Sequence, residues 1–113
     1  MTSRGRCPNR GDVVWIDFSP HAGHEQAGRR PGLVVSPSPY NGAAGLAILC
    51  PITSRVRGHP YEVVLPPGLP VQGVVLSDQA RSFDWRARRS KHACRAPDAV
   101  TLDVLKRLGT LVR

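Results

Sequence analysis

The clearest strand pattern in the sequence is Gly11-Asp12-Val13-Val14-Trp15-Ile16-Asp17-Phe18. Within it, Val14, Ile16 and Phe18 occupy alternate positions and therefore share one face of an extended chain. Trp15 and Asp17 fall on the opposite face. This alternation predicts a strand with one apolar side, and Ser19-Pro20 is expected to end it.

Short strands are expected in the remainder of the chain, because eleven Pro and eleven Gly divide it into short segments. A polar loop of about a dozen residues is predicted from Ser19 to Pro31, and a second basic loop from Thr53 to Pro60. Only the C-terminal segment has helical spacing, with Pro97 and Asp98 suited to its first turn. The prediction is a mostly β (α+β) fold in which one helix packs on a small sheet. The strand segments are Leu33–Val35, Ala44–Pro51, Tyr61–Leu65 and Val74–Leu76.

Length and composition favour a single domain spanning residues 1–113, in which residues 1–9 form a basic N-terminal segment that could be flexible. The apolar runs are far shorter than the roughly 20 residues of a membrane-spanning helix. No apolar run follows the arginines of residues 1–10, so no signal peptide is expected. We therefore expect a cytoplasmic protein without a membrane association.

The formal net charge is +8, and Lys occurs only at Lys91 and Lys106, so almost all the positive charge comes from Arg. Arginine binds phosphate through a planar, bidentate fork, which suggests a polyanionic partner; a high-GC coding bias would enrich Arg without any function. Three basic stretches could line a common groove or could each be a solvated surface. They are Arg29 with Arg30, Arg55 with Arg57, and the cluster Arg81, Arg86, Arg88, Arg89 and Lys91.

Several common sites are not indicated. Cys7, Cys50 and Cys94 are odd in number and form no CxxC pair, which argues against a disulfide framework or a zinc site. His21 and His24 are close in sequence, but no further ligand accompanies them. No GxSxG, GxxxxGK[ST] or GxGxxG motif is present. We expect neither a metal nor a cofactor.

The sequence resembles the MazF/PemK toxins over roughly residues 10 to 112. The resemblance begins in the 11–18 strand and continues through several fragments in the same order and spacing. These are Glu25-Gln26-Ala27-Gly28-Arg29-Arg30-Pro31, Leu33-Val34-Val35-Ser36-Pro37, Tyr40-Asn41, Pro51-Ile52-Thr53-Ser54, Tyr61-Glu62-Val63, and Asp78-Gln79-Ala80-Arg81-Ser82 leading to Trp85.

The resemblance implies an SH3-like small β-barrel with a C-terminal helix, assembled as a homodimer. It implies a sequence-specific endoribonuclease, the toxin of a toxin–antitoxin pair, that cleaves single-stranded RNA without a metal. The 2′-hydroxyl would attack the adjacent phosphate and leave a 2′,3′-cyclic phosphate and a 5′-hydroxyl. The implied protein partner is an antitoxin whose acidic, partly disordered tail would occupy the RNA groove.

The resemblance also implies that Arg30 and Thr53 are the catalytic pair. Negative charge builds on the phosphate oxygens in the transition state, and preorganised donors stabilise it. Arg30 stays charged in proteins, so we assign it electrostatic stabilisation and leaving-group assistance rather than proton removal. Glu25 is the hypothetical base for the 2′-hydroxyl, because it is the only carboxylate in the basic loop. Its alternative role is an ion pair that orders Arg29 or Arg30.

Single-stranded RNA is read through unstacked bases on loops, for which Gln79, Arg81 and Ser82 are candidates. Trp15 and Trp85 are expected in the core. The chain departs from the commonest family pattern at Arg29, which adds a second guanidinium beside Arg30, and at Ser54, where a second Thr is frequent. The other RNA-binding candidates are Gln26, Arg29, Ser54, Arg55, Arg57, His59 and Arg86.

Two other functions remain open at the level of the sequence. A CcdB-like toxin with the same barrel would poison DNA gyrase without nuclease activity, although the Arg30 and Thr53 matches argue against it. A non-catalytic RNA-binding module would need only the arginine clusters and the net charge.

Overall fold

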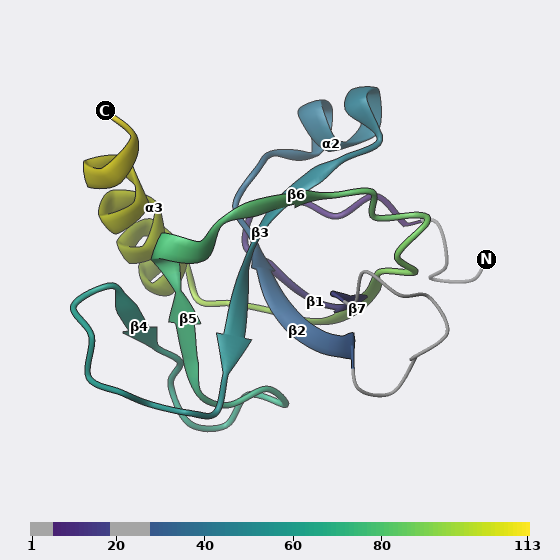
Figure 1. Cartoon of the computed structure of the whole chain (residues 1–113). Helices are drawn as coiled ribbons and strands as arrows, with labels where there is room; N and C mark the ends of the chain where they lie inside the picture. Colours follow the sequence, from purple (N-terminus) through teal and green to yellow (C-terminus); the bar gives the residue numbers. More distant parts are fainter. Residues whose placement is uncertain (1–5, 19–27) are drawn as a thin grey trace.

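The computed structural model describes residues 6–18 and 28–113, and within them one seven-stranded sheet carries helices at its margins (Figure 1). The strands are β1 (Asp12–Asp17), β2 (Arg29–Val34), β3 (Ala47–Thr53), β4 (Glu62–Val64), β5 (Val74–Leu76), β6 (Arg81–Phe83) and β7 (Lys91–Arg95). The helices are α2 (Ser38–Ala44), the 3-10 turn η1 (Ser77–Gln79) and α3 (Asp98–Val112).

The strands pair antiparallel in the order β4-β5-β3-β2-β1-β7, and β6 pairs with β3. Strand β3 is therefore the centre of the sheet, because it contacts β2, β5 and β6. The path of hydrogen bonds ends at β4 and β7, which do not pair with each other. The mostly antiparallel fold with a C-terminal helix is confirmed, whereas a closed barrel is not.

The shared face predicted for Val14, Ile16 and Phe18 is confirmed, but the expectation of only one apolar side is wrong, because Val13 on the opposite face is also buried. Val14 and Ile16 belong to a core cluster with Trp85, and Phe18 packs against that cluster. Val13 belongs to a second cluster, on the other side of the strand. The expectation that Trp15 is a core residue is wrong, because 37% of Trp15 is exposed, whereas Trp85 is buried as expected.

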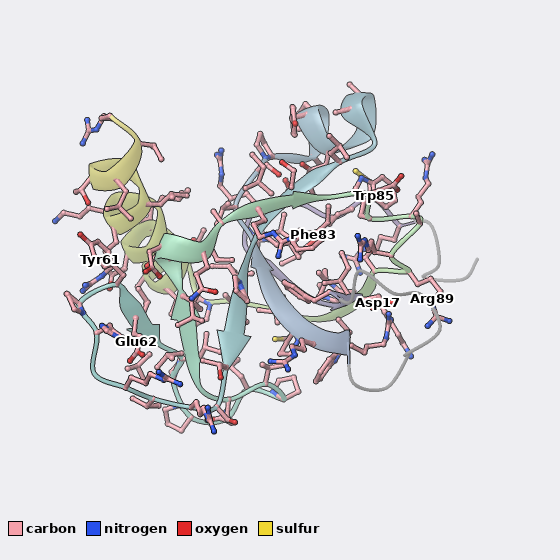
Figure 2. The ribbon with its side chains drawn as sticks, in the orientation of Figure 1. Asp17, Tyr61, Glu62, Phe83, Trp85 and Arg89 are labelled. Carbon is pink, nitrogen blue, oxygen red and sulfur yellow. The ribbon has the colours of Figure 1, made fainter. Side chains whose placement is uncertain are left out.

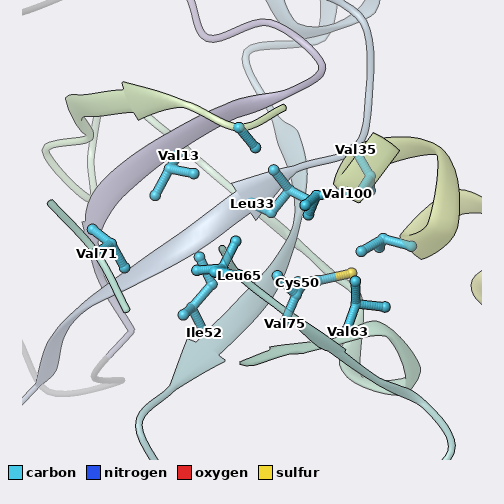
Figure 3. Close-up of a cluster of buried hydrophobic side chains, with 12 residues drawn as sticks. Val13, Leu33, Val35, Cys50, Ile52, Val63, Leu65, Val71, Val75 and Val100 are labelled. Atoms are coloured by element: carbon cyan, nitrogen blue, oxygen red, sulfur yellow. The ribbon is translucent and has the colours of Figure 1, made fainter. Parts of the chain in front are cut away.

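The second cluster is the larger core, and it joins the sheet to α3 (Figure 3). Leu33, Cys50 and Val75 come from three neighbouring strands, and Val100 and Val104 come from α3. The helix begins after Pro97 as predicted, and the negative charge of Asp98 suits its N-terminal turn. This packing holds α3 beside β4 and η1.

The structure differs locally from the expected segments. The strand expected from Ala44 starts at Ala47, because Ser38–Ala44 forms α2, in which proline is tolerated in the first helical turn. Strand β2 begins at Arg29 inside the expected loop, because pairing with β1 prevails over the breaker signal of Pro31. The basic segment after Trp85 contains β7, which pairs with β1.

None of the helices in the described part of the chain is long and apolar enough to cross a membrane.

Candidate functional site

Arg30 and Thr53 lie near the adjacent ends of two neighbouring strands. The antiparallel pairs Gly32 with Pro51 and Leu33 with Cys50 define the β2–β3 register. Arg30 comes just before the first of these residues in β2, and Thr53 comes just after the last of them in β3. Arg30 pairs with Ile16 of β1, and Thr53 pairs with Val74 of β5. The backbone at each residue is therefore held by a further strand of the sheet.

Three surface hollows meet at Thr53. The loop hollow, of about 330 Å³, is lined by Thr53, Arg55, Arg57, His59, Glu62, Leu76, Asp78 and Gln79. The tryptophan hollow, of about 320 Å³, is lined by Trp15, Arg30, Pro31, Ile52, Thr53, Ser54, Pro70, Val71 and Gln72. The central hollow, of about 270 Å³, is lined by Phe18, Arg30, Pro51, Ile52, Thr53, Leu76, Gln79 and Arg81. The central hollow shares residues with each of the others, so the three adjoin, and together they are called the groove here.

Arg30 lines both the tryptophan hollow and the central hollow, each time together with Thr53. The Arg30 side chain is exposed, and no carboxylate in residues 6–18 and 28–113 forms an ion pair with it. Its guanidinium can therefore accept an anionic ligand. A cation and a hydroxyl group that border the same hollow can together stabilise negative charge on one phosphate.

Arg29, the neighbour of Arg30 in β2, makes hydrogen bonds to the backbone instead of lining the groove. Its guanidinium donates to the carbonyl oxygen of Arg89 at 2.7 Å and to that of Arg88 at 3.5 Å. Burial and the nearby charge of Arg89 lower the pKa of Arg29, and Asp17 partly offsets them. Figure 2 shows Asp17 and Arg89 near each other, on the opposite side of the view from Glu62. Arg29 thus holds the turn before β7 and lines none of the three hollows.

The loop hollow is bordered by the segment after β3. The backbone N–H of Arg55 donates to Oγ1 of Thr53 at 3.1 Å, which turns the chain directly after the strand. The Glu62 carboxylate accepts hydrogen bonds from the backbone N–H groups of Arg57, at 3.1 Å, and Gly58, at 2.9 Å. Arg55 and Arg57 face the hollow without an ion pair to any described residue, so the groove keeps their positive charge.

The structure brings most of the sequence-predicted site residues to the groove. These are Arg30, Thr53, Ser54, Arg55, Arg57, His59, Gln79 and Arg81. Arg29, Ser82 and Arg86 do not line it. Ser82, in β6, pairs with Ile48 of β3, and the Arg86 guanidinium stacks on the Trp85 ring at 4.7 Å. Glu25 and Gln26 lie outside the described residues.

Sequence reasoning missed several residues that line the groove. Trp15 is among them, and its alternation with Val14 and Ile16 gave no signal of exposure, because Val13 and Asp17 on the same face are buried. For most of the others no local signal was available, since they are apolar or proline residues at strand ends and turns. The missed residues are Trp15, Phe18, Pro31, Pro51, Ile52, Glu62, Pro70, Val71, Gln72, Leu76 and Asp78.

The fold matches that of solved toxin structures. The crystal structure of MazF (Form-I) from Deinococcus radiodurans superposes with a TM-score of 0.86 at 53% identity, covering 94% of this chain and 96% of that one. A MazE-MazF structure (Form-II) from the same organism superposes with a TM-score of 0.84 at 47% identity, covering 94% and 95%.

Curated relatives agree with the structural neighbours. The endoribonuclease toxin MazF of Escherichia coli (strain K12) is 45% identical over 96 residues, covering 84% of this chain and 86% of the relative. The endoribonuclease PemK of Escherichia coli is 37% identical over 107 residues, covering 91% and 80%. The family model described as "PemK-like, MazF-like toxin of type II toxin-antitoxin system" matches residues 9–112. These matches confirm the resemblance and the enzyme class that it implies. The chain belongs to the PemK-like, MazF-like toxin family of type II toxin–antitoxin systems.

Proposed function

We propose that this protein is a sequence-specific, metal-independent endoribonuclease toxin that cleaves single-stranded RNA. The observation that carries the proposal is that Arg30 of β2 and Thr53 of β3 border the same two hollows. The curated relatives named as endoribonucleases give the reaction class.

In the proposed reaction, the 2′-hydroxyl oxygen attacks the adjacent phosphorus and the bond to the 5′ oxygen of the next nucleotide breaks. The products are a 2′,3′-cyclic phosphate and a 5′-hydroxyl, whose oxygen takes a proton from solvent as it leaves. Arg30 stabilises the negative charge that grows on the non-bridging oxygens and assists the leaving oxygen, and the Thr53 hydroxyl donates a further hydrogen bond. Glu25 remains the proposed base for the 2′-hydroxyl proton.

The groove suits an extended single strand rather than a compact ligand, because three hollows meet at the reacting pair. Arg55, Arg57 and Arg81 are proposed to contact phosphates, and Gln79 and His59 to contact base edges. The partly exposed Trp15 offers a ring on which a base can stack.

An acidic antitoxin is the proposed protein partner, since MazE-MazF structures are among the similar solved structures. Charge complementarity with a chain of formal net charge +8 would speed the association and make it sensitive to salt. A homodimer in the cytoplasm is also proposed. Light scattering after size exclusion measures its mass.

The decisive experiment incubates the purified protein with a long RNA in EDTA and maps the new ends by primer extension. We expect discrete cuts with 5′-hydroxyl ends. A 2′-deoxy substitution at the cut position should stop cleavage and preserve binding. Intact RNA in the presence of gyrase inhibition would favour the CcdB-like alternative, and RNA binding without cuts would favour the non-catalytic one.

A further inference from the structure

We propose that Glu62 is a positioning residue for RNA binding, a role that rests on the proposed ribonuclease function. It is proposed to hold the segment of residues 54–60, called here the arginine loop, in the conformation that presents Arg55, Arg57 and His59 to the loop hollow. Glu62 acts through the backbone of this loop and is not assigned a contact with the reacting atoms.

The backbone of Glu62 is held in place by the sheet. Glu62 is the first residue of β4 and pairs with Leu76 of β5. The preceding carbonyl oxygen, of Tyr61, accepts hydrogen bonds from the backbone N–H and the side-chain hydroxyl of Ser77. Figure 2 shows Tyr61 and Glu62 together on the β4 side of the molecule. The position from which the Glu62 side chain starts is therefore set by the sheet.

The arginine loop, to which the Glu62 side chain reaches, has few hydrogen bonds of its own among the described residues. The Glu62 carboxylate accepts from the backbone N–H groups of Arg57 and Gly58, and the Glu62 N–H donates to the carbonyl oxygen of His59 at 3.1 Å. For residues 56–58, these carboxylate bonds are the only backbone hydrogen bonds found within the described part of the chain. Charge-assisted hydrogen bonds of this kind are about twice as strong as neutral ones. Glu62 is thus placed to determine the loop conformation.

The electrostatic consequence is unusual for a carboxylate in a basic groove. Glu62 forms no ion pair with Arg55 or Arg57, because its oxygens are directed to backbone N–H groups. Both guanidiniums therefore remain available to an anion although a carboxylate lies beside them. Thr53 lines the same hollow as Arg55 and Arg57. When one phosphate of the bound RNA lies at Thr53, the arrangement therefore fits the next phosphate of the same RNA strand.

The chain offers two matched pairs of variants. Glu62→Gln removes the charge and keeps the shape, and Asp84→Asn makes the same change at a carboxylate that also accepts two backbone N–H bonds, from Arg86 and Ala87, away from the groove. Gly58→Ala strains the loop at a φ of 81°, where a Cβ would meet no atom within 4 Å. Gly68→Ala creates the same kind of strain at a φ of 95° in another turn, again with open space.

Steady-state cleavage and binding of a 2′-deoxy RNA test the proposal. Glu62→Gln and Gly58→Ala should raise KM by about tenfold and leave kcat within about twofold, as expected for a lost charged hydrogen bond in the ground-state contact. The slope of log binding constant against log salt concentration should become shallower by as much as about 1.4. The reason is that the phosphate contacts of both Arg55 and Arg57 weaken. Asp84→Asn and Gly68→Ala should match the wild type in all three measurements.

The outcomes separate this inference from the proposed function. Wild-type protein that cleaves no RNA contradicts the proposed function itself. Wild-type cleavage together with unchanged KM and salt slope in both Glu62→Gln and Gly58→Ala overturns the role of Glu62. A lower unfolding temperature with reduced kcat and unchanged KM would show a structural role only, and would also overturn it. Should Glu62→Gln fail to fold, Gly58→Ala decides by the same criteria.

Discussion

Arg29 and Arg30 are consecutive in β2, yet they have different partners: Arg29 donates to the carbonyl oxygens of Arg88 and Arg89, whereas Arg30 borders the groove with Thr53. Successive residues of a strand point to opposite faces, which separates two identical side chains. The structure thus separates the two arginines that are adjacent in the sequence.

Arg30→Ala should lower kcat by about 100- to 1,000-fold, the usual effect of removing one preorganised donor to a transition-state oxyanion. Arg29→Ala should leave kcat near the wild-type value and lower the unfolding temperature, because its contacts hold the turn before β7. Single-turnover cleavage and thermal unfolding of both variants measure this. Loss of cleavage in Arg29→Ala with retention in Arg30→Ala would show that the assigned arginine is wrong.

Thr53→Val should reduce kcat by about 100-fold, since valine keeps the shape of threonine but donates no hydrogen bond. The same change removes the acceptor for the backbone N–H of Arg55. Thr53→Ser keeps the hydroxyl and should retain most of the activity, which separates the hydroxyl from the methyl group. Equal rates for the valine and serine variants would remove the hydroxyl from the mechanism.

Trp15→Ala should weaken binding of uncleavable RNA by about 5- to 100-fold, the range expected for the loss of one base–aromatic stack, and should barely change stability. Trp85→Ala should instead destabilise the fold by about 3–5 kcal/mol. Trp85 is buried, and its indole N–H donates to the carbonyl oxygen of Asn41. Fluorescence titration and urea unfolding distinguish the two tryptophans. A large stability loss in Trp15→Ala would contradict its assignment to the groove.

Gly73→Ala should destabilise the protein by about 3 kcal/mol or more, because its φ of 121° disfavours a side chain and the added Cβ would overlap the carbonyl group of Thr53. The variant should therefore lose activity together with stability. Gly45→Ala is the matched control, with a φ of 71° and no atom within 4 Å of the added Cβ. Urea unfolding of both variants gives the comparison, and similar losses would exclude the proposed overlap.

Stability should fall as the pH rises above about 9. Burial, with a smaller contribution from Asp78, raises the pKa of the Cys50 thiol from 9.0 to about 12. Between these values the unfolded chain has released this proton and the folded chain keeps it, so alkali favours unfolding, by up to about 1.4 kcal/mol per pH unit. Burial also raises the pKa of Cys94, which acts in the same direction. Urea unfolding of wild type and Cys50→Ala at pH 8–10.5 tests this, and identical slopes would contradict it.

The sequence was informative wherever one short segment contains the whole signal. The alternation of Val14, Ile16 and Phe18 predicted one buried face of β1, and the helical spacing of the C-terminal segment predicted α3. The resemblance pointed to Arg30 and Thr53 before any register was known. Side-chain periodicity and the order of motifs are properties of the chain itself, so they can be recognised without coordinates.

The tertiary structure decided the features that depend on contacts between segments distant in the sequence. Strand β2 extends to Arg29 because β1 pairs with it, although Pro31 signals a break. Trp15 borders the groove although Val13 on the same face of β1 is buried, and Glu62 reaches the arginine loop because β4 is anchored on β5. The chain by itself determined which residues alternate and which chemistry they carry. Only pairing between distant strands determined which side chains share a hollow, since register and burial are set by partners that no local pattern contains.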